Sequence, residues 1–505
     1  MIGPVSVARC LRYWADRTPN APAVTDDFTT TSFSELDRVT NRLARAYMAL
    51  GVERGSYVTI ALPNGAEFLR AALATWKAGG IPHPVSYRTP DAERQAMLAL
   101  VKPRLIVGGV AQERAEAARS IPAGFVPSPE LSDGPVDDVI SPHWKAIASG
   151  GSTGRPKVIV SRPAALFDPE VPYRSTETGA VQLVAGPLYH NAPFLLAARG
   201  LFSGHHLVIM SRFDAEQALA RIQRFRVQHI MLVPTMMQRI TRLPDTVLSS
   251  YDVSSLKSII HCAAPCPAWL KRAWIDWLGP DVVQELYGGT EGCGATWISG
   301  REWLERPGSV GRAMTGYRIR VKNAAGEEAR PGETGDVYMM PDGGSGSSYF
   351  YLGATSHRDE DGWEWIGDMG HVDEEGYLFL ADRRTDLIIS GGANIYPAEV
   401  EAAIDAYPGV LASAVIGLPD DDLGAVAHAI VEADREIDES ALMEHLGQQL
   451  VSYKLPRSIE FVSEPIRDEA GKVRRAALRA ARLKVSFSRR EAPLYGAGRG
   501  LPRSG

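Results

Sequence analysis

Apolar residues recur along most of the chain at two alternating spacings, one typical of helices and one typical of buried strands. Residues 32–50 carry them at the spacing of an amphipathic helix, with Gly51 as the expected C-cap, and residues 56–63 form the short apolar run of a strand. A second helix (65–78) and a second strand (104–110) follow in the same way. This alternation predicts α/β layers built on a mostly parallel sheet.

The alternation continues to about residue 308 and then changes. Strand-like runs at 181–186, 205–211 and 229–234 are each followed by a helical pattern, whereas the chain from 318 to 381 contains short strands separated by turns. A new unit begins near residue 397. Its segments read as helix 398–406, strands 410–417 and 425–432, helix 439–450 and strand 458–462. These segments predict a small α+β domain after the larger one.

Composition narrows the class of protein. With 505 residues the chain is long enough for roughly two to four structural units. Its 45% apolar and 23% charged residues are normal for a globular enzyme, and its net charge of −6 gives no reason to bind nucleic acid. The four cysteines are too few for a disulfide framework, and they lack partners at zinc spacing. With no secretion signal and no membrane-spanning apolar run, these features predict a cytoplasmic location.

The first chemical motif is a glycine-rich loop, residues 150–157, that reads Gly-Gly-Ser-Thr-Gly-Arg-Pro-Lys between two strand-like segments. Glycines let backbone N–H groups approach a phosphate, hydroxyls add donors, and a lysine adds charge. The loop is not a Walker A motif, because Pro156 and Val158 stand where that motif needs glycine and Ser/Thr. By itself it indicates a phosphate site of moderate specificity, with a plain hairpin turn as the alternative.

Three further motifs follow. Residues 287–292, Tyr-Gly-Gly-Thr-Glu-Gly, place a hydroxyl beside a carboxylate after a strand, which suits a phosphate and Mg²⁺. Asp368 follows a glycine and precedes the charged run 382–386, where it could accept from ribose hydroxyls. Lys472 follows Gly471 among several arginines. Taken alone, an exposed turn is the better explanation of residues 287–292, and a solvated surface residue is the better explanation of Lys472.

The order of these motifs resembles that of the ANL superfamily, which includes acyl-CoA synthetases, adenylation domains of nonribosomal peptide synthetases and firefly luciferase. The resemblance runs from about Arg17 to Leu483, and the superfamily's loop Ser/Thr-Gly-Ser/Thr-Thr-Gly-x-Pro-Lys is matched from Gly151 to Lys157. Other matching segments are 187–190, 287–291, 307–311, 367–368, 376–378, 390–397 and 469–473.

This resemblance implies an α/β fold with two domains. The larger, residues 1–384, would combine layered α/β subdomains with a distorted β-barrel and bind the acid and ATP. The smaller, residues 385–484, would be a mobile α+β domain that carries Lys472 and rotates about Thr385 between the two half-reactions. Residues 485–505 are predicted to form a disordered basic tail.

The resemblance also implies a reaction and a set of site residues. ATP and Mg²⁺ would activate a carboxylic acid as acyl-AMP, releasing pyrophosphate, and the acyl group would pass to coenzyme A. The catalytic residues would be Lys472, His190, Thr290 and Glu291, with Glu291 also on the metal. The ATP and AMP site would comprise Ser152, Thr153, Gly154, Lys157, Ala263, Ala264, Tyr287, Gly288, Asp368 and Arg383. Coenzyme A would pass along Gly391 and Gly392.

Three positions depart from the superfamily's pattern. Thr385 stands where Asp or Lys is usual at the pivot, Gly150 where Ser or Thr is usual, and Val158 where Gly is common. None of these removes a phosphate ligand, so the enzyme interpretation stands. The β-branch of Thr385 would stiffen the pivot.

Two other functions stay open: a free-standing adenylation enzyme that loads a carrier-protein phosphopantetheine, and a nucleotide-binding protein without catalysis. Retention of both Glu291 and Lys472 argues against the second. Comparing coenzyme A with a carrier protein as acceptor would separate the first from a coenzyme A ligase. The sequence also leaves a homodimer open.

The acid is predicted from three segments that wall the acyl pocket in this superfamily, here 191–196, 233–237, and 288–289 with 292–295. They are apolar, contain two methionines and several small residues, and include no Arg or Lys for a second carboxylate. Segment 187–193 lacks the Asp that pairs with an α-amino group. The prediction is therefore a bulky hydrophobic acid, aromatic or polycyclic, accepted over a broad range; plain core packing is the alternative explanation of the same residues.

Overall fold

The computed structural model describes residues 3–108, 118–149, 157–172, 177–420, 422–469 and 471–490. The chain divides into two compact units. The larger comprises residues 1–385 together with 467–472, and the smaller comprises 386–466 and 473–505. The six residues 467–472 therefore pack with the larger unit, although the chain on both sides of them belongs to the smaller one. Lys472 is the last residue of this segment and therefore belongs to the larger unit.

The first layer of the larger unit is a parallel sheet of order β5-β4-β6-β7. Its strands are β4 (Tyr57–Ile60), β5 (Ile81–Pro84), β6 (Leu105–Val107) and β7 (Arg119–Ile121). Two helices precede this sheet in the chain, α1 (Val7–Arg17) and α2 (Phe33–Ala49). Helix α3 (Ala66–Lys77) connects β4 to β5, and α4 (Asp91–Val101) connects β5 to β6. Ser32 caps α2 by accepting from the backbone N–H of Glu35, and the helix ends just before Gly51, as its pattern predicts. The helix–strand alternation read from the sequence is confirmed here.

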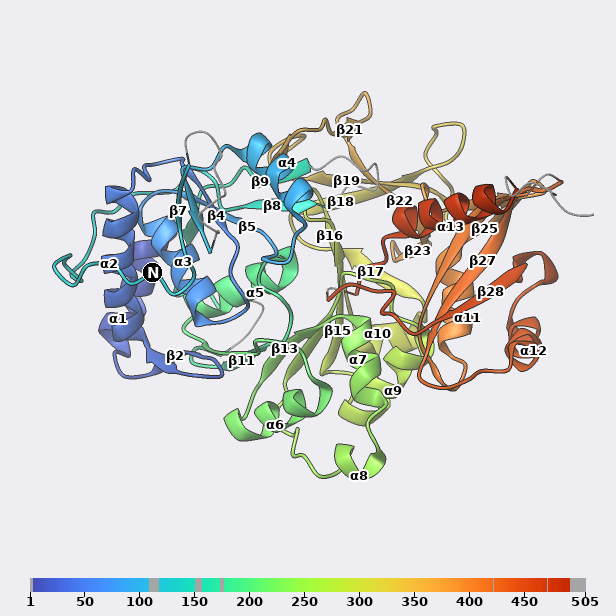
Figure 1. Ribbon diagram of the computed structural model, residues 1–505, viewed down its shortest axis with the longest axis horizontal. Helices are drawn as coiled ribbons and strands as arrows, with labels where there is room; N and C mark the ends of the chain where they lie inside the picture. The colour runs from blue at the N-terminus through green and yellow to red at the C-terminus, as the bar shows by residue number, and fades with distance from the viewer. Residues whose placement is uncertain are drawn as a thin grey trace, which may run out of the picture. The chain divides into compact units, whose positions relative to one another are not determined.

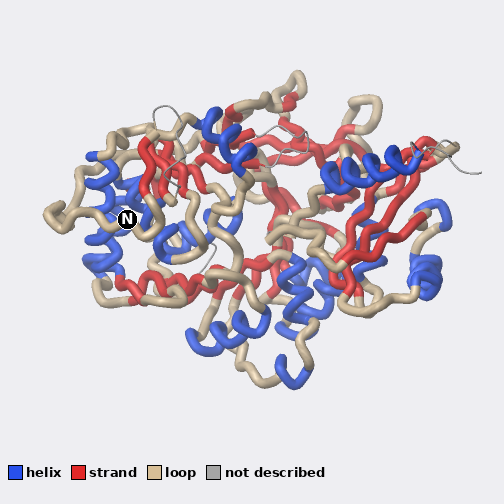
Figure 2. Tube along the Cα trace, in the orientation of Figure 1, coloured by secondary structure: helices blue, strands red, loops and turns tan. Residues whose placement is uncertain are grey.

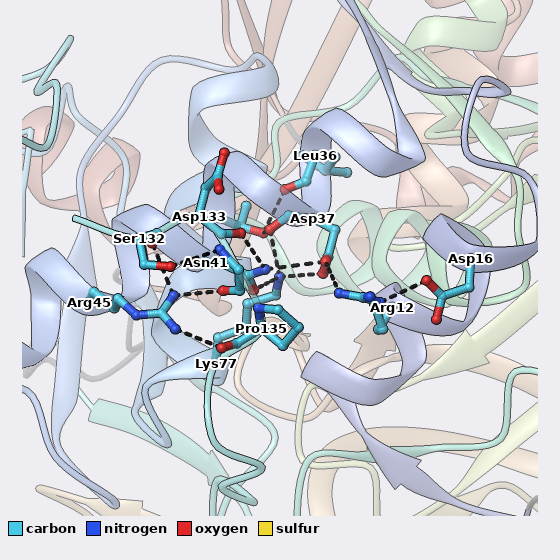
Figure 3. A network of polar contacts seen from close by, with 12 residues as sticks. Arg12, Asp16, Leu36, Asp37, Asn41, Arg45, Lys77, Ser132, Asp133 and Pro135 are labelled. Carbon is cyan, nitrogen blue, oxygen red and sulfur yellow. Dashed lines mark hydrogen bonds and ion pairs between the residues drawn. The ribbon is translucent and has the colours of Figure 1, made fainter. Parts of the chain in front are cut away.

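A buried polar network joins helices α1, α2 and α3 (Figure 3). Lys77, 1% exposed near the end of α3, donates from Nζ to Asp37 Oδ1 at 2.7 Å and to Asn41 Oδ1 at 2.7 Å on α2. Arg12 of α1 approaches Asp37 Oδ2 at 3.7 Å. Asn41 and Arg45 then donate to backbone carbonyls of residues 133–135, which fixes that loop over α2. The buried ammonium of Lys77 and the carboxylate of Asp37 are therefore both paired.

A central parallel sheet forms the second layer, with helices α6, α7 and α9 along one face (Figure 1). Its strands are β11 (Val181–Val184), β12 (His206–Ile209), β13 (His229–Leu232), β14 (Ser258–His261) and β15 (Val283–Gly288). The helices are α5 (Asn191–Phe202), α6 (Ala215–Phe225), α7 (Pro234–Thr241), α8 (Asp245–Leu248) and α9 (Ala268–Leu278). Val184 packs with one core and Leu183 with another on the opposite face. Both faces are thus covered, which explains the continuous apolar runs.

Antiparallel strands extend the same sheet beyond β15. Their order is β15-β16-β17-β23-β22-β19-β18. The strands are β16 (Ala295–Ser299), β17 (Ser309–Ala313), β18 (Tyr317–Lys322), β19 (Gly335–Pro341), β21 (His357–Arg358), β22 (Glu364–Val372) and β23 (Leu378–Arg383), with α10 (Gly300–Glu305) between the first two. The opposite edge ends in β2 (Pro22–Thr25) and β3 (Thr30–Ser32), and a separate antiparallel sheet joins β8 (Ala146–Ser149), β9 (Lys157–Ser161) and β20 (Tyr349–Leu352). The remaining pair is β1 (Val5–Ser6) with β10 (Leu166–Phe167).

The smaller unit is a three-stranded sheet with helices, and its strands are drawn, like all strands, as red tube in Figure 2. Strand β27 (Gly424–Ala433) pairs antiparallel with β26 (Val410–Asp420) and parallel with β28 (Ser458–Val462). Its other elements are β24 (Ile388–Ser390), β25 (Ala393–Ile395), α11 (Pro397–Asp405), α12 (Glu439–Gln449), η2 (Ser452–Lys454) and α13 (Arg475–Arg490). The predicted α+β domain is confirmed.

The predicted start of the tail is wrong by several residues. Residues 485–490, expected to be disordered, are the last part of helix α13. Arg475 forms a bidentate pair with Glu401, both contacts at 2.8 Å, and Arg482 pairs with Glu460 at 2.6 and 2.9 Å. These pairs hold a segment rich in Ala, Leu and Arg, which are strong helix formers. Residues 491–505, the rest of the predicted tail, lie outside the described part of the chain.

Candidate active site

The candidate site lies where adjacent parallel strands end. Strands β11, β13, β14 and β15 run in the same direction, so the loops that follow them emerge at one edge of the sheet. Those loops carry, in that order, His190, Val233, Cys262 with Ala263, and Thr290 with Glu291. Sequence segments up to about a hundred residues apart therefore meet at this edge.

Glu291 lies in a compact polar cluster with Lys157 and Tyr351. It is 9% exposed, and its Oε1 accepts from the Tyr351 hydroxyl at 2.6 Å and lies 3.5 Å from Lys157 Nζ. Lys157 Nζ also donates to Tyr351 Oη at 3.1 Å. Burial and the nearby Glu291 raise the pKa of Tyr351, so its hydroxyl keeps its proton at neutral pH. Tyr351 was missed by the sequence reasoning, because its only signal is pairing of β20 with β9.

Asp368 forms a second cluster with Tyr287 and Arg383. Tyr287 donates to Asp368 Oδ2 at 2.6 Å, and Arg383 Nε lies 3.3 Å from Oδ1. Asp368 and Arg383 are directly opposite in the β22–β23 pair, which explains how residues 15 apart in sequence meet. Burial raises the pKa of Asp368, while Arg383 opposes that rise. The carboxylate is thus fixed between two donors at the sheet edge.

His190 and Ala263 occupy the loops between these clusters. His190 is the N-cap residue of α5, and its ring lies 4.7 Å from that of Tyr189. Ala263 has φ of 74°, a left-handed conformation that is rare for a residue with a Cβ and typical of functional turns. Ala264 lies in the same loop after β14, and Gly288 is the last residue of β15.

Lys472 belongs to the segment that packs with the larger unit. Its surroundings lower the pKa of the ammonium, first through desolvation and then through Arg383, while Asp468, Glu291 and Cys262 oppose the shift. Lys472 as a whole residue is exposed, but its charge interacts with Glu291 of the first cluster and Arg383 of the second. The structure brings together Lys157, Glu291, Asp368, Arg383 and Lys472.

Other predicted residues lie elsewhere. Ser152, Thr153 and Gly154, with Gly150, are outside the described residues. Gly391 and Gly392 form the turn between β24 and β25 in the smaller unit, where Gly391 donates to the Leu423 carbonyl. Thr385 is the last residue of the larger unit before the chain enters the smaller one. Val158 begins the fully buried run of β9.

The three segments expected to wall the acid mostly serve packing. Met236 and Met237 are 4% and 0% exposed inside the core below the central sheet. A Cβ at Gly294 would lie 2.5 Å from Met339 Sδ, so that glycine is required by a close contact; a Cβ at Gly292 would have no atom of the described residues within 4 Å. The smallness of this segment therefore only partly reflects open volume.

A buried lysine from a fourth segment reaches the same wall. Lys145, 6% exposed, donates to Asn191 Oδ1 on the first turn of α5. Burial, followed by Arg199, lowers the pKa of Lys145 to about 7. The three wall segments themselves contain no Arg or Lys. Lys145 lies 46 residues before its partner Asn191, so the sequence of those segments does not indicate it.

Comparison with known proteins identifies the class. The chain matches the family model of AMP-binding enzymes over residues 11–344 and that of the AMP-binding enzyme C-terminal domain over 399–472. It is 34% identical over 487 residues to a feruloyl-CoA synthase of an Amycolatopsis species, covering 92% of this chain and 96% of that one. It is 29% identical over 471 residues to a long-chain-fatty-acid–CoA ligase of Mycobacterium tuberculosis, covering 89% and 92%.

A solved structure has the same fold. The o-succinylbenzoate CoA synthetase of Bacillus subtilis, in complex with its acyl-adenylate intermediate, superposes with a TM-score of 0.79 at 24% identity, covering 93% and 97% of the two chains. Fold, strand-end clusters and family models together define an adenylating enzyme. The chain belongs to the AMP-binding enzyme family, within the ANL superfamily that its motifs resemble, and is an AMP-forming acid–CoA ligase. Its substrates are ATP, a carboxylic acid and coenzyme A.

Among the described residues, no helix has the length and apolar character needed to cross a bilayer.

Proposed function

We propose that this ligase activates an aromatic carboxylic acid and transfers it to coenzyme A. The observation that carries the proposal is the 34% identity, over nearly the full length of both chains, with a synthase of an aromatic acyl-CoA. The largely apolar wall around Asn191, Val233 and Gly292 supports a hydrophobic acid. Lys145 is a cation that could pair with the second carboxylate of a diacid. A lysine with a pKa of about 7, however, carries only part of a charge at neutral pH.

A panel of acids tests this substrate class. Release of pyrophosphate is measured as kcat/KM for acetate, malonate, octanoate, palmitate, benzoate, ferulate and a bile acid. We expect the aryl acids to exceed acetate and malonate by at least about tenfold, since burying a ring is favoured by roughly 1.5–3 kcal/mol. A preference for palmitate or malonate over every aryl acid would contradict the proposal. In parallel, coenzyme A and a pantetheinylated carrier protein are compared as acceptors, and preference for the carrier would support the alternative function.

The two clusters support an assignment of roles. In this proposal Lys157, with Ser152, Thr153 and Gly154, binds the β- and γ-phosphates of ATP, and Thr290 binds the α-phosphate. Tyr287, Gly288, Ala263 and Ala264 frame the adenine, and Asp368 holds the ribose with Arg383 in support. Lys472 bridges the acid and the α-phosphate, and His190 lies near the acid. Such fixed cations and donors stabilise the charge that develops during phosphoryl-type transfer.

Mg²⁺ fits the Glu291 cluster. The described residues contain no group of three or more protein ligands for a metal. A single carboxylate is nevertheless what Mg²⁺ commonly uses when phosphate oxygens and water complete its shell. Glu291, already facing Lys157, would hold the ion, which would neutralise phosphate charge when bound.

Replacing Glu291 by Gln is expected to raise the Mg²⁺ concentration needed for half-maximal adenylation, because a hard cation prefers a charged oxygen ligand. The measurement is initial rate of acyl-AMP formation against Mg²⁺ at fixed ATP. Tyr351→Phe is the matched control: it removes the hydrogen bond to the same oxygen and leaves the charge. An unchanged metal requirement in E291Q would remove Glu291 from the metal site.

Replacing Thr385 by Pro is expected to spare adenylation and slow transfer to coenzyme A by at least about tenfold. Proline fixes φ, and a pivot must change its backbone angles between the two half-reactions. Each half-reaction is measured separately, with Thr385→Ala as the control that keeps backbone freedom. If T385P runs both half-reactions at the wild-type rate, the pivot lies at another residue.

The protein is proposed to work in the cytoplasm. All four cysteines, which lie in the described residues, are free thiols, as expected of a chain kept in a reducing compartment.

A further inference from the structure

The segment that carries Lys472 is a short closed turn. The Asp468 N–H donates to the Lys472 carbonyl at 3.0 Å, the Lys472 N–H donates to Asp468 Oδ1 at 2.9 Å, and the Gly471 N–H donates to the Asp468 carbonyl at 2.8 Å. Because these bonds close the turn on itself, its residues move together. Where the turn is held therefore decides where Lys472 is held.

One attachment of the turn is steric. Gly471 has φ of +75°. A Cβ built on it would lie 3.0 Å from Thr235 Oγ1 and 3.4 Å from Val233 Cγ2, in the segment after β13. This contact sets how closely the turn approaches the sheet edge, but it does not fix its rotation, because it involves no directional bond.

The second attachment is polar and lies at the tip of the turn. Glu469 Oε1 lies 2.6 Å from Arg88 Nη1, and Glu469 Oε2 accepts from the Tyr189 hydroxyl at 2.6 Å. The two partners come from separate parts of the larger unit: Arg88 follows β5, and Tyr189 follows β11, one residue before His190. Both carboxylate oxygens are used, so the two bonds fix the direction of the Glu469 side chain.

The charges around Tyr189 are consistent with this geometry. Burial, and then the bond to Glu469, raises the pKa of Tyr189, which keeps its hydroxyl a donor. The nearby Glu469 raises the pKa of Arg88. Arg88 and Glu469 are 58% and 43% exposed at their side chains, so their attraction is modest and screened by salt. An attachment of this strength can hold the turn and still release it.

We propose that Glu469, Arg88 and Tyr189 form a latch that positions Lys472 for adenylation and opens for the thioester step. The three are positioning residues, since they act through the turn and not on the reacting atoms. The inference rests on the proposed role of Lys472 in the first half-reaction. It assigns a function to Glu469, which is not among the site residues predicted from the sequence.

The test measures the two half-reactions separately in full-length variants. Glu469→Gln and Arg88→Gln are expected to slow acyl-AMP formation by about three- to fivefold, as loss of an exposed charge pair allows. Thioester formation from synthetic acyl-AMP should be unchanged or faster. Arg88→Glu, which places two carboxylates together, should slow adenylation further, and the exchange variant Arg88→Glu/Glu469→Arg should recover most of the rate. Arg301→Gln is the matched control, since it removes an exposed pair with Asp281 away from the site.

The salt dependence of adenylation distinguishes a latch from a merely structural role, which would not change with salt in this way. Adenylation by the wild type should fall between 50 mM and 500 mM salt relative to thioester formation, and the ratio should be flatter in E469Q. Lys472→Ala, assayed alongside, separates the two proposals. If K472A loses adenylation while E469Q and R88E keep it, the latch is wrong and the role of Lys472 stands. If K472A keeps adenylation, the proposed role of Lys472 fails first. Equal loss of both half-reactions in E469Q, or no recovery in the exchange variant, would also overturn the latch.

Discussion

Lys472→Ala is expected to reduce acyl-AMP formation by about 10²–10³-fold while thioester formation from synthetic acyl-AMP is largely retained. One preorganised charge at a developing anion contributes roughly 3–4 kcal/mol to a transition state. The turn that carries Lys472 packs with the larger unit, and its charge interacts there with Glu291 and Arg383. Because desolvation lowers the pKa of Lys472, adenylation should also decline with rising pH earlier than an ordinary lysine would allow.

The measurement is pyrophosphate release for the first half-reaction and loss of synthetic acyl-AMP in the presence of coenzyme A for the second. Lys454→Ala is the control, because it removes an ion pair with Glu399 inside the smaller unit. Equal loss in both half-reactions of K472A would contradict a role confined to adenylation.

Lys77→Met is expected to destabilise the larger unit by about 3–5 kcal/mol, the usual effect of removing one partner from a buried ion pair. The change leaves Asp37, 4% exposed, without the ammonium that lies 2.7 Å from its Oδ1. Arg12, 3.7 Å away, compensates only in part. The loss is measured as the shift of the denaturant midpoint, scaled by the wild-type slope.

Two variants control this experiment. Lys257→Met removes an exposed pair with Glu177 and should change stability by no more than about 1 kcal/mol. Asp37→Leu combined with Lys77→Met removes both charges and should be less harmful than K77M alone, since a well-packed apolar pair often replaces a buried ion pair at little cost. If K77M is no worse than the exposed control, the network of Figure 3 does not hold the three helices together.

The same lysine predicts a dependence on pH. Burial lowers the pKa of Lys77 to about 8 in the folded chain, against about 10.4 for an unfolded lysine. Between these values the unfolded chain retains a proton that the folded chain has released. The part of the free energy of unfolding that is linked to this proton is therefore complete above the unfolded pKa and is lost as the pH falls toward 8. The slope of stability against pH in this window should be smaller in K77M than in the wild type.

The sequence by itself determined the elements whose patterns are local. Strand 458–462 was predicted with the bounds that the structure shows, because the spacing of apolar residues reflects which side of a segment is buried. The order of short motifs from residue 151 to 473 determined the family, since glycines, hydroxyls and a lysine at fixed spacing are themselves sequence features. Element ends were less secure: residues 485–490, expected to belong to the tail, are part of helix α13, whose earlier turns form ion pairs with residues distant in sequence.

Only the tertiary structure decided which distant side chains meet. Tyr351 reaches Glu291 through pairing of β20 with β9, Arg383 reaches Asp368 across β22 and β23, and Lys145, just before β8, reaches Asn191 at the start of α5. In the same way, Glu469 reaches Arg88 across 381 positions of sequence. The residues next to each of these side chains in the sequence do not predict these contacts. Sheet order and the paths of the connecting loops set them, and those follow from how the buried faces of all the elements pack at once.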